Sequence, residues 1–537
     1  MNPTSLPSPR PRPAATASVP GAWLALAFLL LGAGCASLPP MPPREASTAL
    51  TNTGDTTLGQ GISPHLSPGT KESVFYPLSV GAEAYVARLG LCRAAERSLD
   101  VQYYMIHNDA TGNALFREML HAANRGVRVR LLIDDIHTET EDALLAALDA
   151  HPHIEVRIFN PFVHRSSRMW NFATDYRRVN RRMHNKSITA DNQATIVGGR
   201  NVGNEYFGAT SEVDFSDLDV LAGGPVVPEV SAEFDRYWNS SVAWPAGDLL
   251  KPAPDAAAIK AEYDLLEQSV AVESQTEYAK ALPSLELVRA LKEQRLEIFR
   301  GTATVISDPP EKVTMPVDES PHAIRELADI MSRAEREIFL ISPYFVPGQQ
   351  GTKWLVDQAA RGIKVRILTN SFLATDVGAV HSGYMSYRDD LLKAGIEIYE
   401  LKPKLDKEQT KAAKKAAKEE GTDGMGSSRA SLHAKTYMMD GKTIFIGSLN
   451  LDPRSANLNT EMGIVLESEP LAKRFLERFD QLVLNYAYRV ERKPDGQTTW
   501  TTREQGKEVV YDSEPGMTGF KRFSMFLAQV MPMESQL

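Results

Sequence analysis

The chain has 537 residues, of which 43% are hydrophobic and 24% are charged, so it can form two ordinary domains with sizeable cores. Its net charge of −9 argues against wholesale nucleic-acid binding, although a local basic cleft stays compatible with it. The two cysteines, Cys35 and Cys92, cannot build a disulfide framework or a cysteine metal site.

The N-terminal region has the composition of an export signal. An apolar run, Ala22–Leu31, follows a proline- and serine-rich stretch and is too short for a transmembrane helix. The small residues that follow it end at Cys35 and resemble a bacterial lipoprotein cleavage site, except that Gly32 stands where an apolar residue is usual. We expect 1–35 to be a signal peptide or lipoprotein-like export segment with lipidation at Cys35. Plain secretion and an uncleaved membrane anchor are the alternatives.

Two α/β halves follow this region. Residues 36–72 are rich in proline, serine, threonine and glycine and predict a flexible tether. From Ser73, helical and strand patterns alternate, which is typical of a mixed α/β sheet between helices. Helices are expected at 82–97, 114–125 and up to 149, and strands at 98–106, 127–133 and 154–159.

The same order recurs in the second part of the chain. The matching segments are 94–101 with 334–341, 123–132 with 360–368, and 154–158 with 396–400. The chain is therefore an internal duplication, with a period too long for a solenoid. The expected parts are a first half at 73–244, a helical connector at 245–300 that could cover the cleft, and a second half at 301–510.

Two further segments have unusual composition. Residues 405–428 are rich in lysine, glutamate and glycine, and predict a mobile charged loop near the second half-site. The tail, 511–537, places Phe520, Phe523 and Phe526 on one helical face beside basic residues. This amphipathic tail could lie in a bilayer interface or dock on its own domain.

A doubled motif dominates the chemistry. His184, Lys186 and Asp191, followed by Gly198-Gly199 and Asn201, return 249 residues later. The second copy has His433, Lys435, Asp440, Gly447-Ser448 and Asn450 at identical spacing. Each copy predicts a β-hairpin, and residues two apart on a strand face the same side. Histidine can act as nucleophile or as general acid and base, while lysine and asparagine can hold phosphate oxygens.

The doubled motif resembles the signature of the phospholipase D superfamily, His-x-Lys-x4-Asp-x6-Gly-[Gly/Ser]-x-Asn, and both copies match it fully. Flanking segments resemble bacterial cardiolipin synthases, particularly the C-type, at 198–207, 342–347 and 448–455. The resemblance extends from about Ser73 to the C-terminus. It implies two α-β-α sandwich halves that face each other across a pseudo-twofold and share one active site. Such a site is complete in a monomer and needs no metal or other cofactor.

The resemblance also implies roles. His184 would be the nucleophile and His433 the general acid, although the near-equivalence of the copies leaves the opposite assignment open. Charge on the phosphate would be neutralised by Lys186, Lys435, Asn201 and Asn450. A carboxylate that holds a histidine is expected at Glu461 and, by alignment of the copies, at Asp217. We include Asp191 and Asp440 among the candidates, but expect them to fix the hairpins rather than do chemistry. His107 and Tyr344, each just after a repeated core strand, could line the cleft.

Three activities use this machinery. A cardiolipin synthase-like phosphatidyltransferase would act through a phosphohistidine on phosphatidylglycerol, with phosphatidylethanolamine as a possible second substrate. A phospholipase D would use water as the acceptor and release phosphatidic acid. A nuclease or another phosphodiesterase fits the acidic balance and the export signal less well, and no nucleic-acid partner is expected. A non-enzymatic scaffold is disfavoured because neither motif has lost a residue. We expect an exported, membrane-anchored protein on the periplasmic side, with the choice of membrane left open.

Overall fold

The computed structural model describes residues 38, 40–209, 214–316, 323–403 and 430–518. Among these residues, no helix combines the length and the hydrophobicity needed to cross a bilayer. The expectations for Cys35, for the charged loop at 405–428 and for the amphipathic helix in the tail lie outside the described residues.

The first half is built on eight strands. Three central neighbours, β2, β3 and β4, run parallel, and every other neighbouring pair is antiparallel. The order across the sheet is β1 (Glu72–Leu78), β8 (Asp219–Gly223), β6 (Ala194–Gly198), β5 (Ser187–Ala190), β2 (Ser98–Tyr103), β3 (Arg128–Asp134), β4 (Ile154–Phe159) and β9 (Ala243–Pro245).

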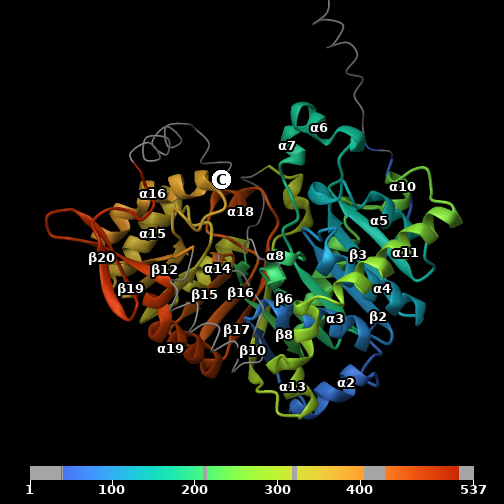
Figure 1. The fold of residues 1–537 in the computed structure, drawn as a ribbon, viewed down its shortest axis with the longest axis horizontal. Coiled ribbons are helices and arrows are strands. Elements are labelled where there is room, and N and C mark those ends of the chain that lie inside the picture. The colour runs from blue at the N-terminus through green and yellow to red at the C-terminus, as the bar shows by residue number, and fades with distance from the viewer. Residues whose placement is uncertain (1–37, 39, 210–213, 317–322, 404–429, 519–537) are drawn as a thin grey trace, which may run out of the picture.

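The second half repeats this order and directionality, and then adds a hairpin at its outer edge. Its strands are β10 (Phe299–Ser307), β17 (Met462–Glu467), β16 (Thr443–Gly447), β15 (Lys435–Met439), β11 (Glu337–Ile341), β12 (Lys364–Asn370), β13 (Glu397–Leu401), β18 (Ala487–Arg492), β19 (Thr498–Glu504) and β20 (Lys507–Tyr511). The edge strands β1 and β10 pair antiparallel, so both halves share one 18-stranded sheet. Figure 1 shows the halves side by side, joined along this seam.

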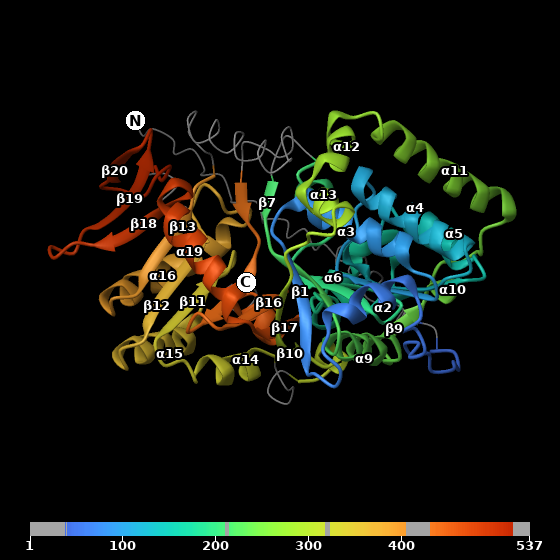
Figure 2. The ribbon, with the colours of Figure 1, turned by 90° about the horizontal axis from the view of Figure 1, so that it is seen from below.

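Helices cover both faces of each half, which confirms the predicted pair of α-β-α sandwiches (Figure 2). In the first half, one face packs against α3 (Gly81–Ala94), α4 (Ala110–Asn124) and α5 (Asp142–Asp149), and the other against α9 (Val226–Trp238). In the second half, the corresponding helices are α14 (Ala323–Met331), α15 (Gly348–Ala360) and α16 (Gly378–Lys393) on one face and α19 (Glu469–Tyr486) on the other.

The remaining helices are short, apart from one in the connector. They are α2 (Thr57–Ile62), α6 (Arg168–Thr174), α7 (Tyr176–Val179), α8 (Asn204–Phe207), α10 (Ala246–Leu249), α11 (Ala256–Glu273), α12 (Glu277–Ala281), α13 (Glu286–Lys292) and α18 (Pro453–Asn457). The connector is helical, as expected, but its longest helix does not cover the cleft. Helix α11 packs on α4 and α5, where Tyr263 donates to the Ala147 carbonyl at 2.8 Å.

The expected tether, 36–72, is wrong over much of its length. The Ser47 carbonyl accepts from the Arg130 guanidinium at 2.8 Å, and the Ala49 N–H donates to Asp235 at 2.8 Å. The buried arginine and the aspartate on α9 thus gain hydrogen-bond partners from this segment. Composition indicated a loop here, but not that the loop would satisfy buried polar groups of the first half.

The alignment of the two copies also needs a one-residue correction. Leu99 pairs with Ala190 and Ile338 pairs with Met439, and these two partners occupy the same position in the two motif copies. Leu99 is therefore equivalent to Ile338. Ala95 therefore corresponds to Ala334, whereas the sequence comparison paired Ala334 with Ala94. A slip of one residue would turn each strand's side chains to the opposite face.

Candidate active site

The two motif segments are held by the opposite halves of the molecule. The His184 N–H donates to the Thr460 carbonyl at 2.9 Å, and the His433 N–H donates to the Ser216 carbonyl at 2.8 Å. A second small sheet extends the latter contact, with β7 (Asp214–Ser216) parallel to β14 (Ala430–Leu432). Each motif histidine thus lies against the segment that leads into the other half's carboxylate.

Each histidine also pairs with a carboxylate from the other half. His184 Nδ1 lies 2.8 Å from Glu461 Oε2, and His433 Nδ1 lies 2.6 Å from Asp217 Oδ2. The histidines are only 8% and 7% exposed, and the carboxylates are buried. The family resemblance predicted Glu461 and alignment of the copies predicted Asp217, but neither predicted that each carboxylate would pair with the histidine of the other half. With Nδ1 occupied, Nε2 is the nitrogen left to face a substrate in each dyad.

Burial and neighbouring charges shift the pKa values of these groups. Burial lowers the pKa of His184 to about 4, against the opposing effect of Glu461. Burial and Lys435 also lower the pKa of His433, while Asp217 acts to raise it. Although burial acts to raise it, His433 and Lys435 hold the pKa of Asp217 well below its usual range. A neutral imidazole beside an ionised carboxylate is the form that a nucleophilic histidine requires.

The lysines and asparagines of the motifs join the histidines. The ammonium groups of Lys186 and Lys435 each donate to the carbonyl of their own motif histidine, and Lys435 Nζ lies 3.2 Å from His433 Nε2. Burial lowers the pKa of both lysines. The side-chain carbonyls of Asn201 and Asn450 are buried and have no partner within the described chain. The buried ammonium groups of the two lysines can neutralise an anionic phosphate, whereas these carbonyl oxygens can only accept a hydrogen bond from a substrate hydroxyl or a protonated oxygen.

The two carboxylates have different support. Glu461 accepts from the hydroxyls of Ser448 and Ser455, at 2.5 and 2.7 Å. Asp217 instead accepts from the backbone N–H of Leu218 at 2.7 Å. The Glu461 dyad is therefore anchored by two side chains from its own half.

Aromatic rings pack edge-on against both histidines. Tyr104 lies 5.1 Å from the His184 ring, and Tyr206 lies 5.2 Å from the His433 ring. The Tyr206 hydroxyl also accepts from the Asn201 amide at 2.9 Å. These edge-on contacts help to set the planes of the histidine rings, and the motif pattern alone did not identify the tyrosines.

A second pair missed by sequence reasoning holds the residue before each histidine. Asp134 accepts from the Met183 N–H at 2.8 Å, and Asn370 accepts from the Leu432 N–H at 2.9 Å. Both lie at the carboxyl end of the second parallel strand of their half. A polar residue that closes an apolar strand is the signal that could have indicated them.

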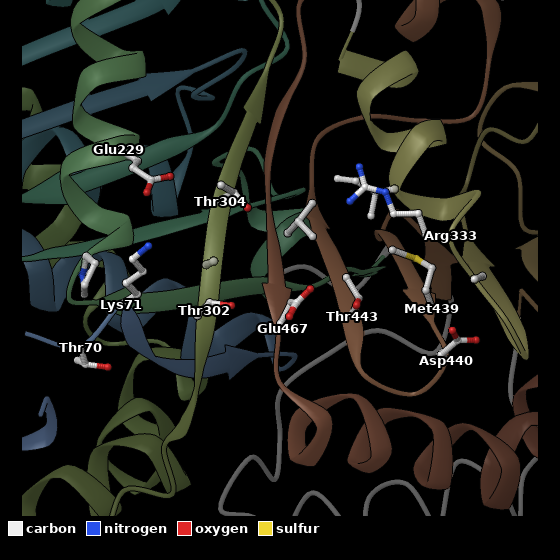
Figure 3. Close-up of a pocket in the computed structure, with 15 residues that line it drawn as sticks. Thr70, Lys71, Glu229, Thr302, Thr304, Arg333, Met439, Asp440, Thr443 and Glu467 are labelled. Atoms are coloured by element: carbon white, nitrogen blue, oxygen red, sulfur yellow. The ribbon is translucent and has the colours of Figure 1, made fainter.

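Asp191 and Asp440 lie at the far ends of the motif hairpins, away from the histidines. Asp440 accepts three backbone N–H groups from 335–337, and Asp191 does the same with 96–98. They fix the turn of each hairpin against the first parallel strand of its half, which is the role expected for them, so they do not belong among the catalytic candidates. A groove of about 720 Å³ lies along β10, next to the seam between the two half-sheets. Asp440, Glu467 and Arg333 are among the residues that line it (Figure 3).

A smaller pocket of about 510 Å³ adjoins the first motif. It is lined by His107, His137 and several carboxylates, and His107 lies 3.1 Å from Glu205. The Tyr104 ring contacts both His137, which lines the pocket, and His184 of the motif. One side chain therefore connects the pocket to His184. His107 thus lines a cavity beside the motif.

Within the described ranges, no group of three or more His, Cys, Asp or Glu side chains forms a metal site. Cys92 is a free, buried thiol.

Comparison with known proteins agrees with this geometry. A family model described as "Cardiolipin synthase, PLD-like domain" matches twice, at residues 90–238 and 327–483. Cardiolipin synthase C of Escherichia coli K12 is 41% identical over 89% of this chain and 99% of its own length. An uncharacterized protein of Helicobacter pylori 26695 is 30% identical over 93% of this chain and 96% of its own.

Among solved structures, phosphatidylserine synthase of Haemophilus influenzae Rd KW20 has a similar fold. The TM-score is 0.54 at 12% identity, over 86% of this chain and 95% of that one. At this identity the likeness concerns the fold alone. The doubled family match and the long relatives establish that the chain belongs to the cardiolipin synthase family of phospholipase D-like phosphatidyltransferases.

Proposed function

We propose that the protein synthesises cardiolipin by transferring a phosphatidyl group to the headgroup hydroxyl of phosphatidylglycerol, through a covalent phosphohistidine. The observation that carries this proposal is the pair of buried histidine–carboxylate dyads, each shared between the halves. Two histidines in one site can divide nucleophilic attack and acid–base catalysis between them.

In the first step, His184 Nε2 attacks the phosphorus of the donor lipid. The bond from phosphorus to the headgroup oxygen breaks, and His433 gives its proton to that oxygen. Asp217 stabilises the protonated form of His433, while Lys186 and Lys435 neutralise the phosphoryl oxygens. In the second step, His433 takes the proton of the acceptor hydroxyl, whose oxygen attacks phosphorus and displaces His184.

The burial of the dyads favours transfer over hydrolysis, because a phosphohistidine that lies away from bulk water survives until a second lipid arrives. The pocket at His107 and Glu205 is connected to His184 through the Tyr104 ring, and its carboxylates offer acceptors for the hydroxyls of a glycerol headgroup. We assign this pocket to the acceptor headgroup.

A product assay tests the function. Vesicles with labelled phosphatidylglycerol and phosphatidylethanolamine are incubated with wild type or with His184→Ala. Labelled cardiolipin formed by wild type alone supports the proposal and identifies the donor. Phosphatidic acid as the sole product would make the protein a hydrolase. No lipid product would refute both and direct the search to other phosphodiesters.

We further propose that the protein is exported and held at the periplasmic side of a membrane by lipid on Cys35. The support is the apolar run that ends in small residues before this cysteine. Cys35→Ala should release the protein from membranes. A mutant that stays bound would show that another part of the chain anchors it.

A further inference from the structure

One surface segment of the first half exposes large apolar side chains to solvent. Residues 165–181 include the short helices α6 and α7, which stand above the first half in Figure 1. Met169 is 79% exposed and Trp170 is 48% exposed. Large apolar side chains grouped on a surface commonly mark an interaction site.

The base of this segment packs on the first half. Asn171 is buried and exchanges two hydrogen bonds with the backbone of His164, each 2.9 Å long. Phe172 packs on Phe162 with the ring centroids 5.8 Å apart. Because the inner side of the segment makes these contacts, Met169 and Trp170 are left on its outer side.

The segment is also basic on an acidic protein. Residues 165–181 contain five arginines and one aspartate, whereas the whole chain has a net charge of −9. Several of these arginines are paired, for example Arg165 with Asp135. In the described part of the chain, no carboxylate pairs with the exposed Arg177, whereas the Arg181 guanidinium donates to the carbonyls of Lys312 and Met315. Positive charge beside exposed Met and Trp is complementary to an anionic lipid surface.

The position of the segment connects it to the cleft. Helix α7 ends five residues before His184, and the Asn180 carbonyl accepts from Arg454 of the second half at 3.0 Å. On the other half, Leu373 and Val377 are 43% and 37% exposed in the loop after β12. Ser431, two residues before His433, donates to the Ala374 carbonyl of that loop at 2.8 Å. Exposed apolar residues thus accompany the approach to both motifs.

We infer that residues 165–181 dock the protein on an anionic phospholipid bilayer, with Met169 and Trp170 in the interface and Arg177 against the headgroups. The inference rests on the proposed function only for the choice of a lipid surface. Docking here would place the cleft next to its substrates, so that a lipid reaches the dyads without leaving the membrane.

Fluorescence quenching tests the docking directly. Full-length protein is mixed with phosphatidylcholine vesicles that contain phosphatidylglycerol and brominated acyl chains. The quenched signal of wild type minus that of Trp170→Phe reports Trp170 alone, whether or not another segment anchors the chain. We expect this difference to be quenched, and quenching to weaken in purely zwitterionic vesicles and at high salt. An unquenched difference would overturn the inference.

A variant pair separates docking from catalysis. The double variant Met169→Glu/Trp170→Glu should lower cardiolipin synthesis on vesicles by roughly tenfold or more, and leave turnover of a short-chain, water-soluble lipid unchanged. The matched control, Leu265→Glu/Val272→Glu, changes two residues of α11 that are 57% and 71% exposed, and should affect neither. Equal losses in both variants, or loss on the soluble lipid, would contradict docking. Quenching without any cardiolipin would refute the proposed function and leave the docking intact.

Discussion

The two half-sites share one plan but differ in how each carboxylate is held. In the second half, Ser448 donates to Glu461; the equivalent residue of the first half is Gly199, next to Asp217. A Cβ at Gly199 would lie 2.4 Å from the Asp217 carboxylate, so the shorter acid occupies the space that a serine needs. The first half thus combines a glycine with the shorter aspartate, and the second half combines a serine with the longer glutamate, so that each carboxylate fits beside its neighbour. The difference favours distinct roles for the two histidines, with the more strongly anchored dyad on the nucleophile.

The largest effects should come from the histidines, and the leaving group can tell them apart. His184→Ala and His433→Ala should each reduce transfer from a natural phospholipid by at least about 10⁴-fold. A donor with a nitrophenyl leaving group needs no general acid, so His433→Ala should recover much of the first step on it, while His184→Ala should not. A burst of nitrophenolate measures this step. Recovery by His184→Ala instead would reverse the two roles.

Exchange of the supporting residues should have the next largest effect. Gly199→Ser places its side chain against Asp217 and should displace the His433 dyad, with a loss of about 10²-fold or more in kcat. Ser448→Gly removes one hydrogen bond from Glu461 and leaves the one from Ser455, so about tenfold is expected. Steady-state kinetics of both variants check the comparison. A larger loss in Ser448→Gly would contradict it.

Much of this arrangement was accessible from the sequence because the chemistry is local in each motif. The repeated spacing identified the histidines, the lysines and the hairpins. The family resemblance indicated Glu461, and alignment of the copies then indicated Asp217. The crossing of the dyads joins residues 216 and 277 positions apart, and local patterns carry no such information. The contact between Tyr206 and His433 was missed for the same reason, whereas Asp134 had a local signal, a polar residue that closes an apolar strand. The tether was misjudged because proline- and serine-rich composition reports low local order and not the buried acceptors that such a segment can satisfy.

The pH dependence should separate the dyads further. Because the pKa of His184 is lowered to about 4, its neutral form dominates above that pH. We expect kcat/KM to fall only as the pH drops through about 4, well below the ordinary range of histidine. Glu461→Gln removes a charge that raises this pKa and should move the acidic limb lower still. Asp217→Asn should instead move the alkaline limb to lower pH, because His433 then loses its proton more readily. An acidic limb near pH 6.5 would contradict a neutral, buried His184.

The smallest effects should come from the residues that hold the motif backbones. Asn370→Ala leaves the Leu432 N–H without its acceptor and should lower the free energy of unfolding by about 1–3 kcal/mol. Asp134→Ala does the same to Met183 and also removes the carboxylate that lies 3.3 Å from the buried Arg182, so about 3–5 kcal/mol is expected. Denaturant unfolding measures both. Because each residue acts only on the chain just before a histidine, kcat should fall in both variants while the acidic limb of kcat/KM stays in place. An equal loss of stability in the two variants would contradict this difference between the halves. It would show that the hydrogen bonds from Arg182 to the carbonyls of Val179 and Asn160 are enough to stabilise the buried guanidinium without Asp134.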